Sequence, residues 1–407
     1  MARALTKSPF FVLLCAVGIV FLAYGSRQSF GVYLPPITRD LGWEVSAFSG
    51  ALAIQALVYG LSAPFVGAVA DKWGAVRVIV VAGLLYSAGI FLMSQSVTPT
   101  GMRLSAGLFG GVGSAGCALS LVLAVASRVA PDNRRGLWLG IITSAGTGGQ
   151  LVIVPLSQFM ISGHGWVFAL MALGFGVLLI LPLGLMMGRA AGDMLTSKKD
   201  SLGLVDALKE ARAHPGFWLL SLGFFTCGFQ VQYINNHLPN FLNDVGLAPM
   251  VAASAISVIG LFNMIGTWIS GWLADRYRKK YLLASLYLCR SLVFVVFISV
   301  PVTPLSVYVF AVCIGLLWLA TVPLTSGIVF GMFGPRYMAT LYGIVFFFHQ
   351  VGSFTSVWLG GIIRDINGSY DVAWWIIIIG GTLASFLHWP IDDRPVDEVL
   401  ADRKAAV

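Results

Sequence analysis

Apolar runs of about twenty residues recur along the whole chain and constrain its fold more than any other feature. A helix of about 20 apolar residues is long enough to cross a membrane with a ~30 Å hydrocarbon core. Only 10% of the 407 residues are charged, against about 25% in soluble domains, so a soluble globular fold is excluded. We therefore predict an all-α membrane protein with twelve transmembrane helices, at residues 9–35, 46–70, 77–96, 101–127, 137–161, 166–188, 216–240, 250–273, 281–300, 304–332, 339–362 and 373–391.

The longest polar interruption, 189–214, divides these spans into two sets of six. The predicted domains are an N-terminal six-helix bundle (1–188), a linker (189–214), a C-terminal bundle (215–391) and a tail (392–407). The first span is too long for a signal peptide, and we expect it to be retained.

The basic residues predict the orientation of the spans. One face of the predicted topology carries 20 of the 25 Lys and Arg residues, and the other carries Arg39, Arg103 and Arg364. By the positive-inside rule the basic face, with both termini, is cytoplasmic. This topology explains the net charge of +8, so no nucleic-acid partner is needed.

An internal repeat links the two sets of spans. Residues 67–74 (GAVADKWG) follow the second span and 271–278 (GWLADRYR) follow the eighth, at an offset of 204. Gly140 and Gly149 match Gly343 and Gly352 at an offset of 203. Together with the two sets of six spans, these matches indicate duplication of a six-helix unit.

The paired G-x-x-x-D-[RK] loops, the twelve spans and the long middle loop resemble the major facilitator superfamily over essentially the whole chain. The ending of the first span, 31–43 (GVYLPPITRDLGW), resembles bacterial monocarboxylate and oxalate/formate-type porters, as do 349–354 (HQVGSF) and 358–361 (WLGG). The resemblance implies a secondary transporter with two bundles around a central cavity. The eighth span departs from the animal carriers, because Asn263 and Thr267 stand near the places of their Asp and Arg.

Arg27 is the first candidate for substrate binding. A cation in hydrocarbon is costly and is a functional-site hypothesis by default, and no Asp or Glu lies within the predicted spans. An arginine can hold a carboxylate through two charge-assisted hydrogen bonds. Tyr24 and Gly31 share its helix face at i−3 and i+4. We expect Arg27 and Tyr24 to bind an anion; a gate or a tether to backbone carbonyls is the alternative.

Arg290 repeats the pattern, with Tyr287 at i−3. The resemblance implies that the ninth span is a peripheral support helix. Arg290 and Tyr287 therefore either contribute to the substrate site or tether helix ends.

Polar residues of other spans complete the predicted site. His349, beside Gln350, is the candidate proton carrier because imidazole titrates near neutral pH; packing is the alternative. Gln55, Gln150 and Asn263 are candidates for the substrate path, although such residues more commonly bond helix to helix. His237 is either an outer-gate residue or an interfacial cap.

The two repeated loops are predicted gates. The resemblance implies an inner gate at Asp71, Arg77, Asp275 and Arg276; a solvated charge cluster is the alternative. The chain has no nucleotide-binding loop, no metal-ligand spacing and no nucleophile–base pair, so we expect neither an enzyme nor a cofactor or metal site. All five cysteines fall in apolar runs and are interpreted as packing residues.

The predicted function is secondary active transport of a small organic anion, a monocarboxylate, across the cytoplasmic membrane by alternating access. Proton coupling would require His349 or the carboxylate itself to carry the proton. The alternative is a carrier or exporter of a larger neutral or aromatic compound, such as a vitamin or drug. We expect a monomer in the bilayer.

Overall fold

A computed structural model describes residues 9–131, 134–191, 209, 211–212, 214–334, 338–396 and 398–399. In this part of the chain, ten segments are long and apolar enough to cross a membrane. One of them, Arg135–Arg189, is 55 residues long and contains two spans, because Gly165 turns the chain with a φ of 83° that glycine adopts without strain. The less apolar α16 (Met338–Asn367) supplies the remaining span, so the fold has twelve.

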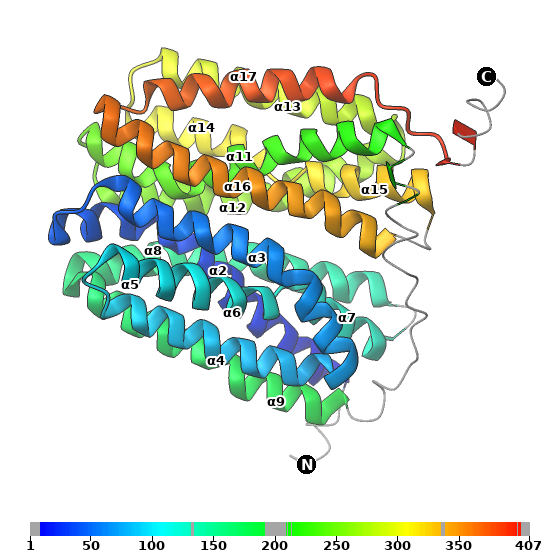
Figure 1. Cartoon of the computed structure of the whole chain (residues 1–407), viewed down its shortest axis with the longest axis horizontal. Coiled ribbons are helices and arrows are strands. Elements are labelled where there is room, and N and C mark those ends of the chain that lie inside the picture. The colour runs from blue at the N-terminus through cyan, green and yellow to red at the C-terminus, as the bar shows by residue number, and fades with distance from the viewer. Residues whose placement is uncertain are drawn as a thin grey trace.

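The spans form two bundles that lie side by side (Figure 1). The N-terminal bundle comprises α2 (Pro9–Leu41), α3 (Val45–Trp73), α4 (Ala75–Ser94), α5 (Pro99–Met102), η1 (Arg103–Phe109), α6 (Gly110–Gly116), α7 (Leu119–Val129), α8 (Arg135–Leu178) and α9 (Ile180–Ala191). The C-terminal bundle comprises α11 (Pro215–Asp244), α12 (Pro249–Ala274), α13 (Lys279–Ser299), α14 (Pro304–Leu317), α15 (Thr321–Phe333), α16 and α17 (Asp371–His388).

Each bundle has its own core of buried apolar side chains. The first core is built mainly from residues of α2, α4 and α8, and the second includes the fully buried rings of Phe224, Trp318 and Trp374. The bundles contact one another through α2 against α11, α3 against α16 and α8 against α12. These six helices therefore surround any site between the bundles.

Glycines at equivalent positions show the internal repeat in three dimensions. A Cβ on Gly149 of α8 would collide with the carbonyl oxygen of Phe21 in α2, and one on Gly352 of α16 would collide with that of Phe225 in α11. Gly352 lies 203 residues after Gly149, and Phe225 lies 204 residues after Phe21. The same close helix crossing is thus built once in each bundle.

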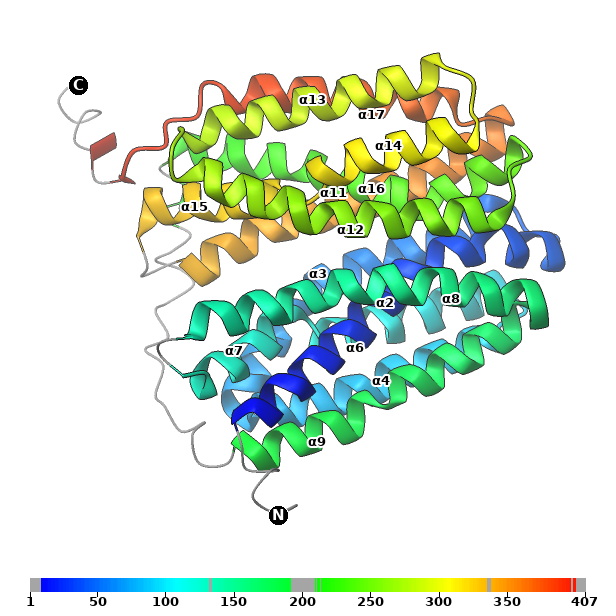
Figure 2. The same ribbon diagram turned by 180° about the vertical axis from the view of Figure 1, so that it is seen from behind.

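The bundles diverge toward one end. We call the end where α9 stops and α11 begins the linker end, and the opposite end the far end. Toward the linker end α3 separates from α16, and α8 from α12 (Figures 1 and 2). Four glycines on the linker-end parts of these helices have no atom within 4 Å of the position that a Cβ would take: Gly67, Gly140, Gly271 and Gly343. The structure is therefore open between the bundles at the linker end.

Two spans are interrupted in ways that the sequence analysis did not predict. The fourth span contains a π-helical segment, Arg103–Phe109, and breaks between α6 and α7 at Cys117–Ala118. The tenth breaks between α14 and α15, at residues 318–320. A broken helix leaves backbone groups without their usual partners, and inside a membrane these groups must be bonded by side chains.

Candidate functional site

Hydrogen bonds and close backbone contacts join the bundles at the far end. The carboxylate of Asp365, in α16, accepts hydrogen bonds from the backbone N–H groups of Val45 (2.9 Å) and Ser46 (2.8 Å) at the start of α3. Gly361 packs against Ser46 and Ser49 one turn further in. These contacts close the passage between α3 and α16 at this end.

The helix pair α2 and α11 closes a second part of the far end. Gly31 lies so close to α11 that a Cβ would collide with the carbonyl oxygen of Asn235. The Asn235 amide donates to the side chain of Gln28 (3.3 Å), and Arg39 donates to Asn243 (3.3 Å). The structure is therefore closed at the far end and open at the linker end.

Arg27 lies near the middle of α2, where the closed part of the molecule meets the opening. Its guanidinium group donates to Gln350 Oε1 of the other bundle (3.3 Å) and stacks over the Tyr59 ring, 4.3 Å from the centroid. Arg27, Tyr24 and Tyr59 are half-buried, whereas Gln350 is buried and packs over Gly60. Among the described residues no carboxylate bonds to Arg27. Its positive charge is thus held between the bundles by neutral partners.

A ladder of aromatic rings continues from Tyr59 into the C-terminal bundle. The Tyr59 ring meets Phe346 edge-on, with centroids 6.1 Å apart. Phe346 stacks on the His349 imidazole at 5.5 Å with an interplanar angle of 7°, and Phe224 lies on the other side of that imidazole at 5.0 Å. His349 is only 6% exposed, and its Nδ1 has no hydrogen-bond partner. The structure thus brings Arg27, Tyr24, His349 and Gln350 together with Tyr59 and Phe346.

Arg290 lies inside the C-terminal bundle and is fully buried. Its guanidinium group donates to the carbonyl oxygens of Leu317 and Trp318 (2.7 Å for Trp318), which end α14, and to Gln230 Oε1 (3.1 Å). Tyr287 stacks on His388 at 4.9 Å. Of the two roles open to Arg290, this geometry favours the tether, because Nη2 already donates to both carbonyls of the broken tenth span, although Nε has no partner among the described residues.

Asn263 and Ser270 bond to the same break from α12. The Leu319 N–H donates to Asn263 Oδ1 (3.0 Å), and Ser270 donates to the Ala320 carbonyl (2.6 Å). The backbone groups at the break between α14 and α15 are therefore bonded by side chains of two neighbouring helices: Arg290 of α13 and Ser270 of α12 donate, and Asn263 of α12 accepts. The position of Asn263 favours a helix-to-helix bond over a place on the substrate path.

Other predicted residues are distributed between the interface and the bundle interiors. Gln150 of α8 joins the bundles by donating to the Ile256 carbonyl of α12 (3.0 Å). Gln55 stays within the N-terminal bundle, where it donates to the Ala106 carbonyl (3.1 Å). His237 lies near the far end but is buried within the C-terminal bundle, between Val357 (2.9 Å) and Tyr370 (3.2 Å). This buried position favours helix packing, and it supports neither the outer gate nor the interfacial cap predicted for His237.

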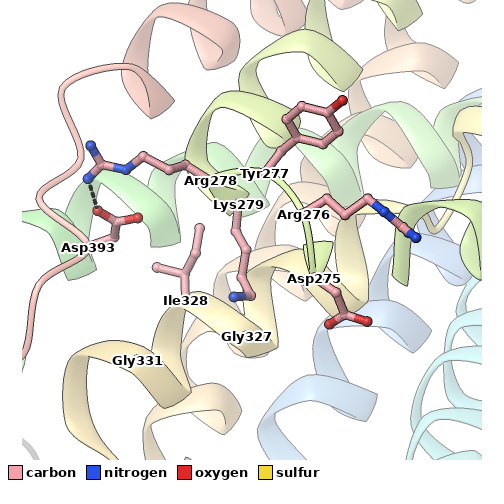
Figure 3. Close-up of a pocket in the computed structure, with 9 residues that line it drawn as sticks. All are labelled: Asp275, Arg276, Tyr277, Arg278, Lys279, Gly327, Ile328, Gly331 and Asp393. Atoms are coloured by element: carbon pink, nitrogen blue, oxygen red, sulfur yellow. Dashed lines mark hydrogen bonds and ion pairs between the residues drawn. The ribbon is translucent and has the colours of Figure 1, made fainter. Parts of the chain in front are cut away.

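The predicted gate residues lie at the open linker end. Arg77 donates to the Trp73 carbonyl within its own bundle (3.4 Å), and Arg276 stacks on Trp272 at 3.7 Å. The side chain of Asp71 lies outside the described residues. Asp275 lines a cavity of about 360 Å³ formed by the α12–α13 loop and α15 (Figure 3).

The same cavity contains an ion pair. Arg278 bonds to Asp393 at 2.6 Å, which raises the pKa of this exposed arginine. Lys279 crosses Gly327 of α15 and points into the cavity, whereas Arg276 points away from it (Figure 3). All of these residues belong to the C-terminal half, so this cavity is distinct from the site between the bundles.

Sequence analysis missed the carboxylates at the far end because it ended the helices too early. α2, α11 and α16 continue to Leu41, Asp244 and Asn367, several residues beyond the predicted spans. These extensions include Asp365 and also Asp40, which accepts a hydrogen bond from Trp166 (2.8 Å). The predicted spans contain no carboxylate, but these longer helices do, and no described carboxylate bonds to Arg27 or Arg290.

The fold and the site define a membrane carrier built from two similar bundles around a central cation. The model of the Major Facilitator Superfamily matches residues 16–357. The chain belongs to this family, whose members are carriers and not enzymes.

Similar curated proteins include transporters of several kinds. An uncharacterized MFS-type transporter YcxA of Bacillus subtilis (strain 168) is 25% identical over 93% of this chain and 94% of its own. The oxalate:formate antiporter of Oxalobacter formigenes is 25% identical over 98% of this chain and 96% of its own. Monocarboxylate transporter 13 of Rattus norvegicus is 26% identical over 86% of this chain and 81% of its own.

Solved structures support the fold. A bacterial homologue of the human lysosomal transporter Spinster, in an inward-facing and unoccupied conformation, superposes with a TM-score of 0.75 at 17% identity, over 93% of this chain and 96% of its own. The nucleoside transporter NupG superposes with a TM-score of 0.73 at 17% identity, over 93% of this chain and 99% of its own. At these identities the likeness extends to the fold alone.

Proposed function

We propose that the protein moves a small organic anion, a monocarboxylate, across the cytoplasmic membrane by alternating access. The observation that carries this proposal is the position of Arg27. It is a half-buried cation at the inner end of the opening, and it contacts both bundles without a carboxylate partner among the described residues. A carboxylate that replaced the Gln350 amide oxygen would gain charge-assisted hydrogen bonds in a dry environment.

The number of available cations favours an anion of a single charge. Arg290 is the other arginine deep in a span, and its guanidinium already donates to Leu317, Trp318 and Gln230. One cation can neutralise a monocarboxylate, whereas a second carboxylate on the same ligand would lie unpaired in a low-dielectric site. The monocarboxylate transporter among the relatives is consistent with this substrate class, whereas oxalate, one of the two substrates named for the antiporter, carries two carboxylates.

The positive-inside rule supports a cytoplasmic linker end, with both termini on that side. The open side of the structure would then be the cytoplasmic side. In the reverse state the bonds of Asp365 and the contact of Gly31 with Asn235 would break, and the repeated loops at Asp71 and Asp275 would approach the opposite bundle.

A proton would be carried either by His349 or by the substrate as its neutral acid. His349 is next to Gln350 and has an unpartnered Nδ1. No described carboxylate lies beside Arg27, so an acidic side chain at this site has no part in the proposal.

The experiment compares Arg27→Gln with Arg27→Lys in proteoliposomes. Uptake is measured for a panel of monocarboxylates, dicarboxylates and neutral compounds of similar size. We expect Arg27→Gln to abolish carboxylate uptake. Arg27→Lys should retain part of the uptake, because lysine keeps the positive charge but cannot form the bidentate hydrogen bonds of arginine. Normal carboxylate uptake by Arg27→Gln would refute the proposed function.

A further inference from the structure

We infer that the carboxylate taken by this site carries an aromatic or similarly planar group, which packs against the exposed surfaces of Tyr59 and Phe346. The inference rests on the proposed function and specifies the substrate within it. Its basis is the juxtaposition of the single available cation with two half-buried rings from opposite bundles.

The rings lie directly beside the cation. Arg27 stacks over Tyr59 at 4.3 Å, and Tyr59 meets Phe346 at 6.1 Å. Among the ring contacts and hydrogen bonds between bundles described above, the Tyr59–Phe346 pair is the one nearest the linker end. It therefore forms the inner wall of the opening, and a ligand that enters from the linker end meets these rings next to Arg27.

Both rings retain exposed surface. Tyr59 and Phe346 are half-buried, unlike the fully buried rings of the two cores such as Phe224 and Trp374. Phe346 is held in orientation by its parallel stacking on His349, which Phe224 supports from behind. A planar ligand would continue this ladder, because offset or edge-to-face ring pairs are favourable at centroid distances of 4.5–7 Å.

The ladder also explains why the wall is aromatic and not aliphatic. Tyr59 offers its π face to Arg27, so it orients the guanidinium group while the neighbouring Phe346 remains free of polar contacts. A carboxylate bonded to Arg27 would extend its body along Phe346.

The test measures binding of radiolabelled benzoate to the detergent-purified full chain, with three unlabelled competitors. Benzoate itself is compared with cyclohexanecarboxylate, which has the same charge and a similar volume without the planar π system, and with benzyl alcohol, which has the ring without the charge. We expect cyclohexanecarboxylate to bind about two- to twelvefold more weakly than benzoate, the range of one ring pair, and benzyl alcohol not to compete.

Phe346→Leu should remove the preference of benzoate over cyclohexanecarboxylate while leaving carboxylate binding. Phe348→Leu is the matched control, because Phe348 lies on the same helix but its ring contacts Trp218 within its own bundle, at 6.2 Å. It should keep the wild-type preference.

The outcomes separate this inference from the proposed function. Equal binding of benzoate and cyclohexanecarboxylate, or equal effects of Phe346→Leu and Phe348→Leu, would overturn the aromatic wall and leave a carboxylate site at Arg27 intact. Failure of radiolabelled benzoate to bind, while directly measured radiolabelled cyclohexanecarboxylate binds, would do the same. Competition by benzyl alcohol as strong as by benzoate would refute both.

Discussion

Asp365 caps a helix of the opposite bundle: its carboxylate accepts the backbone N–H groups of Val45 and Ser46 at the start of α3. The residue at the N-cap position itself, Glu44, makes no side-chain cap. The first turn of α3 therefore depends on α16 for its cap, and it has this partner only while the far end is closed.

Asp365→Ala should shift the equilibrium toward the state that is open at the far end. Loss of an N-cap costs about 1 kcal/mol, which corresponds to a roughly fivefold larger open fraction. The measurement is labelling of Ser49→Cys, a fully buried position beside Gly361, with a membrane-impermeant maleimide on intact cells.

The parent with native Ser49 gives the background from the five natural cysteines. Unchanged labelling of Ser49→Cys in the presence of Asp365→Ala would show that this cap does not contribute to far-end closure.

Gly31→Val should prevent the closed far end from forming. The added side chain would occupy the space of the Asn235 carbonyl, and a collision with backbone is relieved only by separating α2 from α11. The folded chain should persist with Ser49→Cys labelled far more strongly than in the parent. Gly67→Val is the control, since its surroundings are open, and it should leave the labelling unchanged.

Arg290→Gln should destabilise the protein, whereas Arg27→Gln should not. Arg290 is fully buried and bonds to two backbone carbonyls at the end of α14, and hydrogen bonds to charged groups contribute about 1.5–3 kcal/mol. Thermal unfolding of the detergent-purified variants is the measurement.

A lower midpoint for Arg290→Gln together with substrate affinity close to that of the parent would support the tether. If Arg290→Gln unfolds like the parent and loses carboxylate binding, the arginine belongs to the substrate site instead.

His349→Gln should separate exchange from proton-driven uptake if the imidazole carries the proton. The variant keeps a polar side chain beside Gln350, so carboxylate exchange across proteoliposomes should remain within about threefold of the parent. Uptake driven by an imposed pH gradient should fall at least tenfold. Persistence of gradient-driven uptake in His349→Gln would assign the proton to the substrate, transported as its neutral acid.

The sequence by itself determined the class of fold. Twelve apolar runs can satisfy their backbone hydrogen bonds in a membrane only as helices, and the repeated loops at offset 204 imply two similar bundles. Arg27 could also be predicted as a site residue from sequence, because a lone cation in an apolar run is costly and suggests a function. Gln350 and His349 were identified in the same way, as polar residues of an otherwise apolar helix.

Only the tertiary structure distinguished Arg27 from Arg290. Both are lone arginines with a tyrosine at i−3, so their local sequences predict the same chemistry. The difference arises from their distant neighbours: Arg27 faces the other bundle at Gln350, whereas Arg290 meets the carbonyls of the helix break that precedes Pro323. The partners of Asp365 and the pairing of Tyr59 with Phe346 were also set by packing between segments about 300 residues apart. Such contacts depend on how the bundles meet, which apolar periodicity and residue spacing within one helix do not encode.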